Sequence, residues 1–222
     1  ILYEDEALIA LEKPQGLLMH PSFSRNEGTL ANYLAGYYKR TGQRCAVHPV
    51  SRLDRDTFGV VLLAKNAYVH ELMRRQHAGG GLEKTYHALT RGVPDPPEGE
   101  IDAPVARVPG DSLLREIRPD GKPARSRYRV LEERAGCAKL ELSPLTGRTH
   151  QLRLHCAYLG CPILGDPQYG TPESRTLSAH YGIAGQQLCA VRLRFLHPMT
   201  KKTVEIRAAG DVSLDFLERT VV

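Results

Sequence analysis

Short apolar runs, many of them alternating with polar residues, dominate the chain and predict strands. They occur at residues 1–3, 7–11, 59–64, 82–90, 127–132, 137–142, 188–195 and 203–208. The first two flank an acidic turn and predict a hairpin, and the fifth and sixth predict a second antiparallel pair. Residues 93–125 are rich in proline, glycine and charge, which predicts an exposed hairpin excursion with short strands.

Apolar residues at helical spacing predict four helices. They cover residues 29–39, the segment from 66 to the glycines at 79–81, 149–160 and 212–219. Asn66 and Thr149 are residue types that cap helix N-termini, and Gly160 is typical of a helix end. Because no fixed-period repeat interrupts this order, we predict one α+β domain over residues 1–222 with a largely antiparallel sheet.

The chain of 222 residues is 41% hydrophobic and 25% charged, which suffices for a core without disulfide or metal staples. Its apolar runs fall far short of the ~20 residues that span a bilayer, so we expect no membrane partner. Five cysteines form no Cys-x-x-Cys pair, and the N-terminus is acidic where a signal peptide is basic. These features predict reduced thiols in a cytoplasmic protein.

The positive charge of the chain bears on its possible partners. The formal net charge is +5, and 22 of the 30 basic residues are arginine. Arginine favours planar, bidentate contacts to phosphate or carboxylate, so the balance hints at nucleic acid. Basic proteins without such a partner are common, however, and charge alone leaves both interpretations open.

Three segments could carry chemistry. Asp54 lies between Arg52 and Arg55, just ahead of a buried strand, where its neighbours favour the carboxylate that a nucleophile or base requires; a surface loop with routine ion pairs is the alternative. Residues 146–153 end a strand and open a helix, which makes either an anion site or an ordinary capped helix start. Tyr86 could stack on a base or exchange a proton, although a strand tyrosine is more often core.

The spacing of the residues argues against three other kinds of site. His150 and His155 are five residues apart and do not share a helix face, so no metal site is predicted. The glycines at 79–81 lack the lysine and hydroxyl residue of a phosphate loop. Asp54 and Asp56 do not obviously reach the paired geometry of glycoside hydrolysis.

Three ordered motifs resemble those of the RluA-type RNA pseudouridine synthases. They are Arg52-Leu53-Asp54-Arg55-Asp56-Thr57-x-Gly59, Lys84-Thr85-Tyr86 and Gly147-Arg148-Thr149-His150-Gln151-Leu152-Arg153, which continues into Leu159-Gly160-x-Pro162-Ile163-Leu164-Gly165-Asp166-Pro167-x-Tyr169-Gly170. Glu12-Lys13-Pro14-x-Gly16-Leu17 and Leu188-Cys189-Ala190 also fit in order. The resemblance runs from about Ile1 to Arg207.

The resemblance implies a pseudouridine synthase fold, with a mixed, largely antiparallel central sheet and with helices and loops around a catalytic cleft. It implies isomerisation of uridine to pseudouridine in a structured RNA, with ribosomal RNA favoured over transfer RNA, and without metal or organic cofactor. We expect a cytoplasmic monomer whose partner is RNA. Many members carry a small RNA-binding module ahead of the catalytic domain, and we expect none within this chain.

Site residues also follow from the resemblance. Asp54 would be the catalytic aspartate at the ribose–uracil junction, Tyr86 would stack on uracil and help to remove its C5 proton, and Arg148 would form a salt bridge with Asp54. The residues expected to bind RNA are Arg52, Arg55, Thr57, His150, Gln151, Arg153 and Leu188. Ser51, Phe58 and Cys189 replace residues common in the family, so we expect them to influence site preference.

Two other functions compete with this one. A catalytically inactive RNA-binding or ribosome-assembly protein could keep the fold, although it would not need Asp54, Tyr86 and Arg148 together. A hydrolase of a glycosyl bond would release free uracil or sugar, whereas an isomerase leaves the RNA mass unchanged.

One basic stretch is expected to follow the RNA backbone, with a solvated hairpin as the alternative. It contains Arg115, Arg118, Lys122, Arg125, Arg127 and Arg129.

Overall fold

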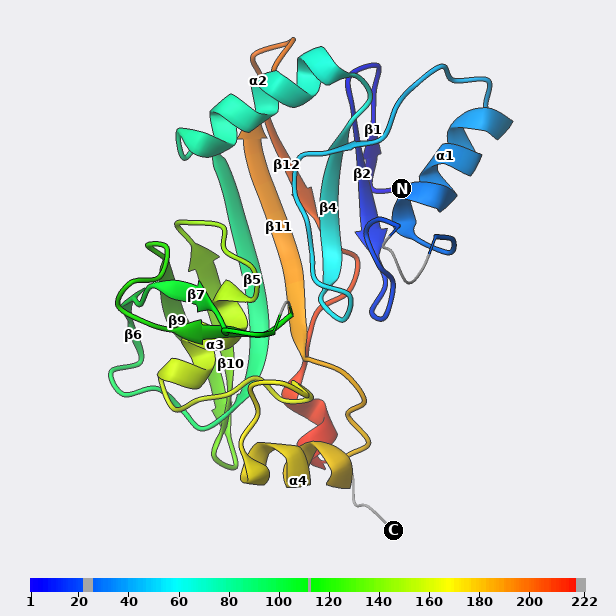
Figure 1. Cartoon of the computed structure of the whole chain (residues 1–222). Coiled ribbons are helices and arrows are strands. Elements are labelled where there is room, and N and C mark those ends of the chain that lie inside the picture. The colour runs from blue at the N-terminus through cyan, green and yellow to red at the C-terminus, as the bar shows by residue number, and fades with distance from the viewer. Residues whose placement is uncertain (22–25, 112, 219–222) are drawn as a thin grey trace. The chain divides into compact units, whose positions relative to one another are not determined.

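The computed structural model describes residues 1–21, 26–111 and 113–218, which fall into two compact units (Figure 1). The first unit is built from Ile1–Lys84 and Ala190–Gly210, and the second from Thr85–Cys189 and Asp211–Val222. The chain therefore passes between the units three times, and each unit joins segments that are distant in sequence. The predicted α+β class with a largely antiparallel sheet is confirmed.

The elements follow the sequence pattern closely. The first unit contains β1 (Tyr3–Glu4), β2 (Leu8–Lys13), α1 (Leu30–Arg40), β3 (His48–Pro49), β4 (Phe58–Ala64), α2 (Ala67–Ala78) and β12 (Thr203–Arg207). The second contains β6 (Glu98–Asp102), β7 (Val105–Arg107), β8 (Arg115–Ile117), β9 (Arg125–Arg134), β10 (Cys137–Pro144), α3 (Gln151–Tyr158), α4 (Pro172–His180) and the 3-10 helix η1 (Leu214–Glu218). Strands β5 (Leu82–Arg91) and β11 (Leu188–Leu196) each begin in one unit and end in the other.

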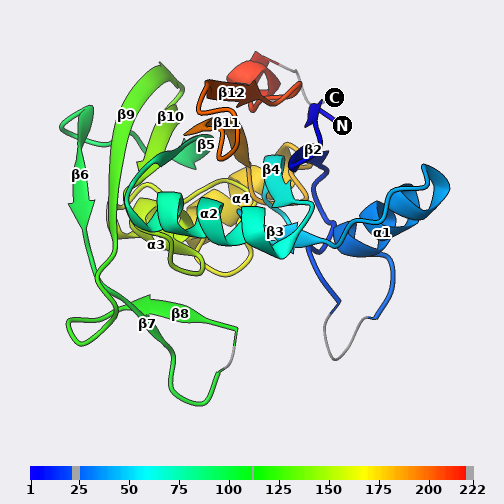
Figure 2. The same ribbon diagram turned by 90° about the horizontal axis from the view of Figure 1, so that it is seen from above.

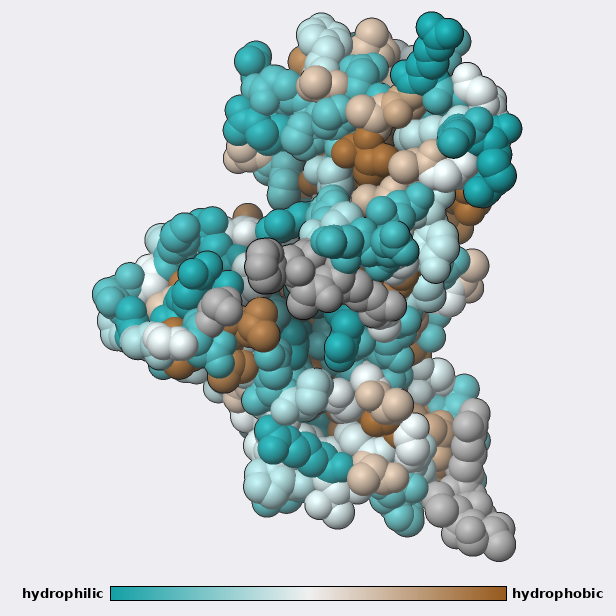
Figure 3. Space-filling model, turned by 45° about the vertical axis from the view of Figure 1, so that its right-hand side comes forward, coloured by the Kyte–Doolittle hydropathy of each residue, from teal (hydrophilic) through white to brown (hydrophobic). Residues whose placement is uncertain are grey.

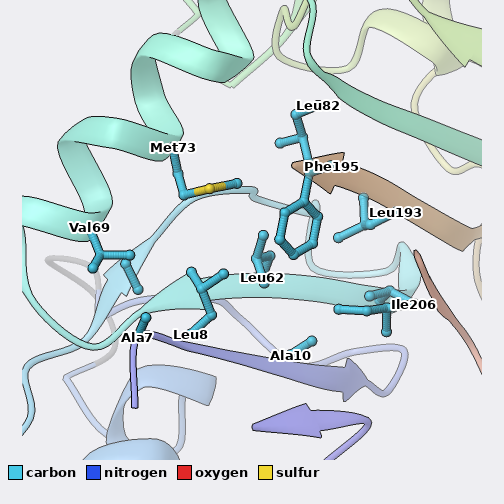
Figure 4. Packing of buried hydrophobic residues seen from close by; sticks show 12 residues of the cluster. Ala7, Leu8, Ala10, Leu62, Val69, Met73, Leu82, Leu193, Phe195 and Ile206 are labelled. Carbon is cyan, nitrogen blue, oxygen red and sulfur yellow. The ribbon is translucent and has the colours of Figure 1, made fainter. Parts of the chain in front are cut away.

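The first unit is organised by the antiparallel strands β1, β2 and β4, with β12 antiparallel to β11. Its helices start where the caps predict, because Thr29 and Asn66 accept hydrogen bonds from backbone N–H groups of α1 and α2. Figure 4 shows the core that results, with Met73 from α2 packed among side chains of β2, β4 and β11. The predicted hairpin and both helices are confirmed.

Gly59 allows the start of β4 to lie against β11. Its φ is +102°, and a Cβ there would lie 2.4 Å from the carbonyl oxygen of Ala190. That distance is far inside van der Waals contact, and the φ is one that side chains strongly disfavour. Any other residue would therefore push apart the strand that follows the Asp54 loop and its neighbour.

In the second unit β5, β10, β9 and β6 form successive antiparallel pairs, which confirms the predicted pair of strands. Tyr86 on β5 lies opposite Leu142 on β10, and β10 ends two residues later at Pro144. The proline-rich excursion becomes β6 and the hairpin β7–β8, which Figure 2 shows projecting from β9 and β10. Val105 anchors this hairpin against Leu154 of α3.

Three helix predictions need correction. Thr149 does not cap α3, because His150 takes that position with φ +57° and no side-chain cap; the side chain of Gln151 binds the preceding turn instead. Helix α4 was not predicted, although Thr171 followed by proline at the first helical position is a typical helix start. The last helix is a 3-10 segment over Leu214–Glu218, and Arg219 lies outside the described residues.

All five cysteines carry free thiols. Across the described residues, no helix combines the length and apolar character needed to cross a bilayer. The face drawn in Figure 3 is mostly hydrophilic, with apolar residues in separate small patches.

Candidate active site

The loop that carries Asp54 leads directly into β4. A backbone turn closes it, because the Thr57 N–H donates to the Asp54 carbonyl at 3.2 Å. Ser51 is buried and accepts a hydrogen bond from the Leu62 N–H at 3.0 Å. The loop is therefore attached to β4 at its base, and Asp54 is partly buried.

Lys13 is a further residue that supports this loop, although its motif alone suggested no role for it. Its side chain is fully buried, and its Nζ donates to the carbonyls of Pro14, Leu17 and Arg55 at 3.0, 2.8 and 2.7 Å. Burial lowers the pKa of Lys13 to about 8, while the carboxylates of Asp56 and Asp54 act in the opposite direction. The buried ammonium of Lys13 thus connects the end of β2 to the Asp54 loop through hydrogen bonds.

The neighbouring arginines are arranged differently from the sequence expectation. Arg55 does not direct its guanidinium at Asp54 as a simple flanking charge but binds Asp56 through two nitrogens, at 3.0 and 2.7 Å. Arg52 is exposed, and Thr57 is buried. Among these candidates Arg52 and Arg55 have the exposure that an RNA contact requires, whereas Thr57 supports the loop through its backbone.

Tyr86 and the residues next to it lie on β5. Tyr86 is 8% exposed, so only a small part of its ring is open to a ligand. Burial lowers the pKa of Lys84 to about 8. His87 lies on the opposite face of β5 from Lys84 and Tyr86, and its Nδ1 lies 2.9 Å from the Asp211 carboxylate. Nζ of Lys139 donates to the same carboxylate at 2.7 Å.

Arg148 lies in the turn between β10 and α3 and is exposed. Its Nε donates to the Pro123 carbonyl at 3.0 Å, and its backbone N–H donates to Oε1 of Gln151 at the same distance. Tyr86 and Arg148 belong to the second unit, whereas Asp54 belongs to the first. The second unit brings Tyr86 and the Arg148 turn to the same end of β5 and β10.

Gln151 and Arg153, both expected to bind RNA, are buried at 4% and 5% exposure. Arg153 forms a two-nitrogen pair with Asp166 at 2.7 and 2.8 Å and stacks on the Tyr169 ring. Burial alone would raise the pKa of Asp166, but Arg153 and two backbone N–H groups hold it below its usual value. Such a pair fixes the loop after α3 and leaves little of Arg153 for a ligand.

His150 and Leu188 complete the candidate list. Nδ1 of His150 lies 2.8 Å from the Tyr169 hydroxyl, which also accepts a hydrogen bond from the Arg115 N–H of the β7–β8 hairpin. Leu188 and Cys189, at the start of β11, are 3% and 0% exposed. His150 therefore links α3 to the hairpin, and Leu188 presents only a small apolar surface.

The basic stretch spans β8 and the first part of β9. Its ion pairs join Arg118 to Glu116 and Asp120, Arg125 and Arg127 to Glu100, and Arg129 to Glu141. Exposed pairs of this kind contribute little to stability, so phosphates can displace the carboxylates. The RNA-backbone role of this stretch stays a prediction.

Within the described ranges 1–21, 26–111 and 113–218, histidine, cysteine and acidic side chains form no group of three that could hold a metal ion. The chemistry that the described candidates offer is that of a carboxylate on a rigid loop, a largely buried phenol and an exposed guanidinium. Each of these residue types suits reaction at a sugar–base bond, because a carboxylate can attack or stabilise the sugar and an aromatic ring can hold the base.

Comparison with known proteins connects this site to a family. A family model of RNA pseudouridylate synthases matches residues 7–158, which include Asp54, Tyr86 and Arg148. A Bacillus subtilis protein with the name uncharacterized RNA pseudouridine synthase YjbO is 35% identical over 208 residues, or 94% of this chain and 71% of that protein. Ribosomal large subunit pseudouridine synthase C of Vibrio cholerae is 34% identical over 215 residues, or 97% and 67%. The solved structure of human RNA pseudouridylate synthase domain containing 4 aligns with a TM-score of 0.75 at 25% identity, over 98% of this chain and 90% of that one.

Proposed function

The chain belongs to the RNA pseudouridylate synthase family and is an RNA-modifying isomerase, and on that premise we propose that it converts specific uridines of ribosomal RNA to pseudouridine through the Asp54 carboxylate. The observation that carries the proposal is the order of three motifs within the matched residues. Asp54, Tyr86 and Arg148 all fall inside that match. The likeness to a ribosomal large subunit enzyme favours ribosomal over transfer RNA.

In the proposed reaction the bond between N1 of uracil and C1′ of ribose breaks, and a bond between C5 and C1′ forms. A proton leaves C5 and N1 gains one, so the RNA mass does not change. Asp54 acts at C1′, because a carboxylate can attack or stabilise an electron-poor sugar carbon. The target base must leave its stack to reach a partly buried carboxylate.

Tyr86 and Arg148 take supporting roles in this proposal. Tyr86 stacks on the extruded uracil and assists removal of the C5 proton, through the part of its ring that remains exposed. Arg148 pairs with Asp54 and holds its charge in place. Arg52 and Arg55, both exposed, contact the RNA backbone or the displaced base. Residues 1–222 act as one catalytic domain and as a monomer in the cytoplasm.

The test is nucleoside analysis of cellular RNA from a strain that lacks this protein, with pseudouridines mapped to single positions. We expect at least one ribosomal RNA position to lose its pseudouridine and to regain it when the wild-type gene is restored. Restoration by a gene encoding Asp54→Asn would refute the role of the Asp54 carboxylate, and no change at any position would support the inactive RNA-binding alternative. Release of free uracil by the purified protein would support a hydrolase.

A further inference from the structure

A buried chain of hydrogen bonds in the second unit has no part in the reaction described so far. It runs through Gln151 of α3, Ser126 of β9 and His155 of α3, and ends on the carbonyl of Ala103. Gln151 is 4% exposed, and Ser126 and His155 are fully buried. Polar groups so far from water are costly unless each meets a partner of the right kind, so the direction of every bond matters.

His155 sets the direction at one end. Its Nε2 lies 3.1 Å from the Ala103 carbonyl, which can only accept, so Nε2 carries a hydrogen. Burial lowers the pKa of His155, against the opposing effects of that hydrogen bond and of Asp102, and the ring is therefore neutral. Its Nδ1 then has an available lone pair, and the hydroxyl of Ser126, 3.0 Å away, must donate to it.

The remaining bonds follow from that donation. Because the Ser126 hydrogen is used, its oxygen is left to accept from Nε2 of Gln151 at 2.9 Å. The same Nε2 donates to the Arg125 carbonyl, and Oε1 of Gln151 accepts from the Arg148 N–H at 3.0 Å and the Thr146 hydroxyl at 2.8 Å. A rotated amide would point its NH₂ group at the Arg148 N–H. These hydrogen bonds therefore permit a single orientation of the Gln151 side-chain amide.

We propose that Gln151, Ser126 and His155 are positioning residues that hold the turn of Arg148 in one conformation. The proposal rests on the role of Arg148 in the function proposed above. The hydrogen-bond chain fixes the backbone of Arg148 from one side, while its Nε bond to Pro123 holds the side chain from the other. Gln151 thus acts inside the protein, and not on RNA as its motif position suggested.

The Ser126 hydroxyl is the part of this chain whose removal disturbs packing least. Ser126→Ala leaves Nδ1 of His155 without a donor and takes one of the two acceptors from the Gln151 amide. We expect kcat to fall about 10-fold with KM within about twofold, because only a transition-state interaction is weakened. The matched control is Ser174→Ala, since Ser174 is 1% exposed and donates to the carbonyl of Thr171, the cap of α4; it should change neither constant by more than about twofold.

A second measurement separates action through Arg148 from general damage. Arg148→Lys removes the guanidinium that the hydrogen-bond chain positions. Adding Ser126→Ala to Arg148→Lys should therefore reduce kcat by less than about twofold relative to Arg148→Lys alone. A full 10-fold loss in both backgrounds would show that Ser126 does not act through Arg148.

Hydrogen exchange at the Arg148 amide gives a readout without RNA. Its N–H donates to Gln151, so Ser126→Ala should accelerate exchange there about 10-fold and Ser174→Ala should not. If thermal unfolding showed that Ser126→Ala does not fold, Thr146→Val would replace it. The Thr146 hydroxyl lies in the strand–helix turn and donates to Oε1 of Gln151. Thr146→Ser keeps the hydroxyl and should restore both slow exchange and turnover.

The outcomes distinguish this inference from the proposed function. Wild-type protein that makes no pseudouridine would refute the proposed function, and the exchange rates would still decide whether the chain holds the turn. Active wild-type protein with unchanged kcat and unchanged Arg148 exchange in Ser126→Ala would overturn the inference alone.

Discussion

A buried lysine ammonium at the end of β2 supports the Asp54 loop, whereas an amide, a hydroxyl and a neutral imidazole support the Arg148 turn. In the first, Lys13 donates to three backbone carbonyls, one of them in the Asp54 loop itself. In the second, Gln151 accepts the Arg148 N–H and connects it through Ser126 to β9. Both supports are buried and both act on backbone groups.

The difference follows from the charge that each segment carries. A cation near Asp54 opposes no charge that the loop needs, and the carboxylates of Asp54 and Asp56 partly offset the cost of burying it. A cation near Arg148 would repel the guanidinium, so neutral groups serve there. The two supports therefore differ in charge, as the groups that they hold do.

Loss of the Asp54 charge should have the largest effect. Asp54→Asn is isosteric, so folding and RNA binding should stay nearly intact while pseudouridine formation falls at least about 1,000-fold. The matched control is Asp56→Asn in the same loop, which should keep kcat within about threefold. Pseudouridine formation on a defined RNA checks both, and more than a few per cent of wild-type activity in Asp54→Asn would refute the assignment.

Removal of the Arg148 charge should have the second-largest effect on turnover. Arg148→Met should lower kcat by about 100-fold, because the proposed partner of the Asp54 carboxylate is lost. Arg134→Met is the control, since Arg134 is a partly exposed arginine of the same unit that pairs with Glu132 and Glu218. Normal turnover in Arg148→Met, measured beside that control, would contradict the salt-bridge role.

Substitution of Lys13 tests the other support. Lys13→Met removes the donor from three carbonyls whose hydrogen bonds are partly buried, so we expect a loss of about 1–3 kcal/mol in unfolding free energy and a kcat about 10-fold lower. Lys65→Met is the control, because Lys65 is also buried in the first unit but pairs with Glu4. It should reduce stability without reducing kcat. An equal loss of kcat in both variants would mean that Lys13 acts only through stability.

Alkaline pH sharpens the same test. The pKa of Lys13 is about 8 in the folded protein against 10.5 as its ordinary value, so the unfolded chain binds more protons between these values. The Lys13 contribution to stability therefore rises with pH across that window, while turnover falls as the loop loses its cation. The rise in stability should be absent from Lys13→Met. A fall in turnover that Lys13→Met shares would originate elsewhere, in the RNA or in a group such as Lys84, whose pKa is also about 8.

The basic stretch should have a smaller effect that falls on binding. Arg115→Ala/Arg118→Ala and Arg125→Ala/Arg127→Ala should each raise KM several-fold with little change in kcat, because they remove uniform binding. For every phosphate that the variant protein no longer binds, the dependence of log affinity on log salt should flatten by roughly 0.7 to 0.9. Unchanged salt slopes in both double variants would place the RNA elsewhere.

Chelation should have the smallest effect. If the two loops perform the reaction through a carboxylate, exhaustive treatment with chelators should leave turnover within about twofold, because no Lewis acid is needed. The RNA must be refolded and checked separately, since its own structure can depend on magnesium. Zinc or magnesium that restores a lost turnover would count against this mechanism.

Local pattern predicted most elements of the fold. The caps Thr29 and Asn66, the alternating strands and the apolar face of α2 all act within one turn or one strand, so sequence neighbours decide them. The start of α3 was mispredicted because His150, and not Thr149, takes the N-cap position in a left-handed conformation, next to a Gln151 side chain that binds Arg125 and Ser126 of β9. The capping propensity of Thr149 could not reveal partners that lie on a distant strand.

By itself, the sequence determined most of the secondary-structure order, the family and the three motifs that contain Asp54, Tyr86 and Arg148, because these are properties of residues adjacent in the chain. Only the tertiary structure decided which motif residues are buried supports: Lys13 reaches a loop 42 positions away, and Gln151 meets Ser126 across 25. The physical reason is that a lysine or glutamine has no fixed role until its polar atoms find partners. Folding brings those partners together from distant segments, and burial then makes each hydrogen bond obligatory.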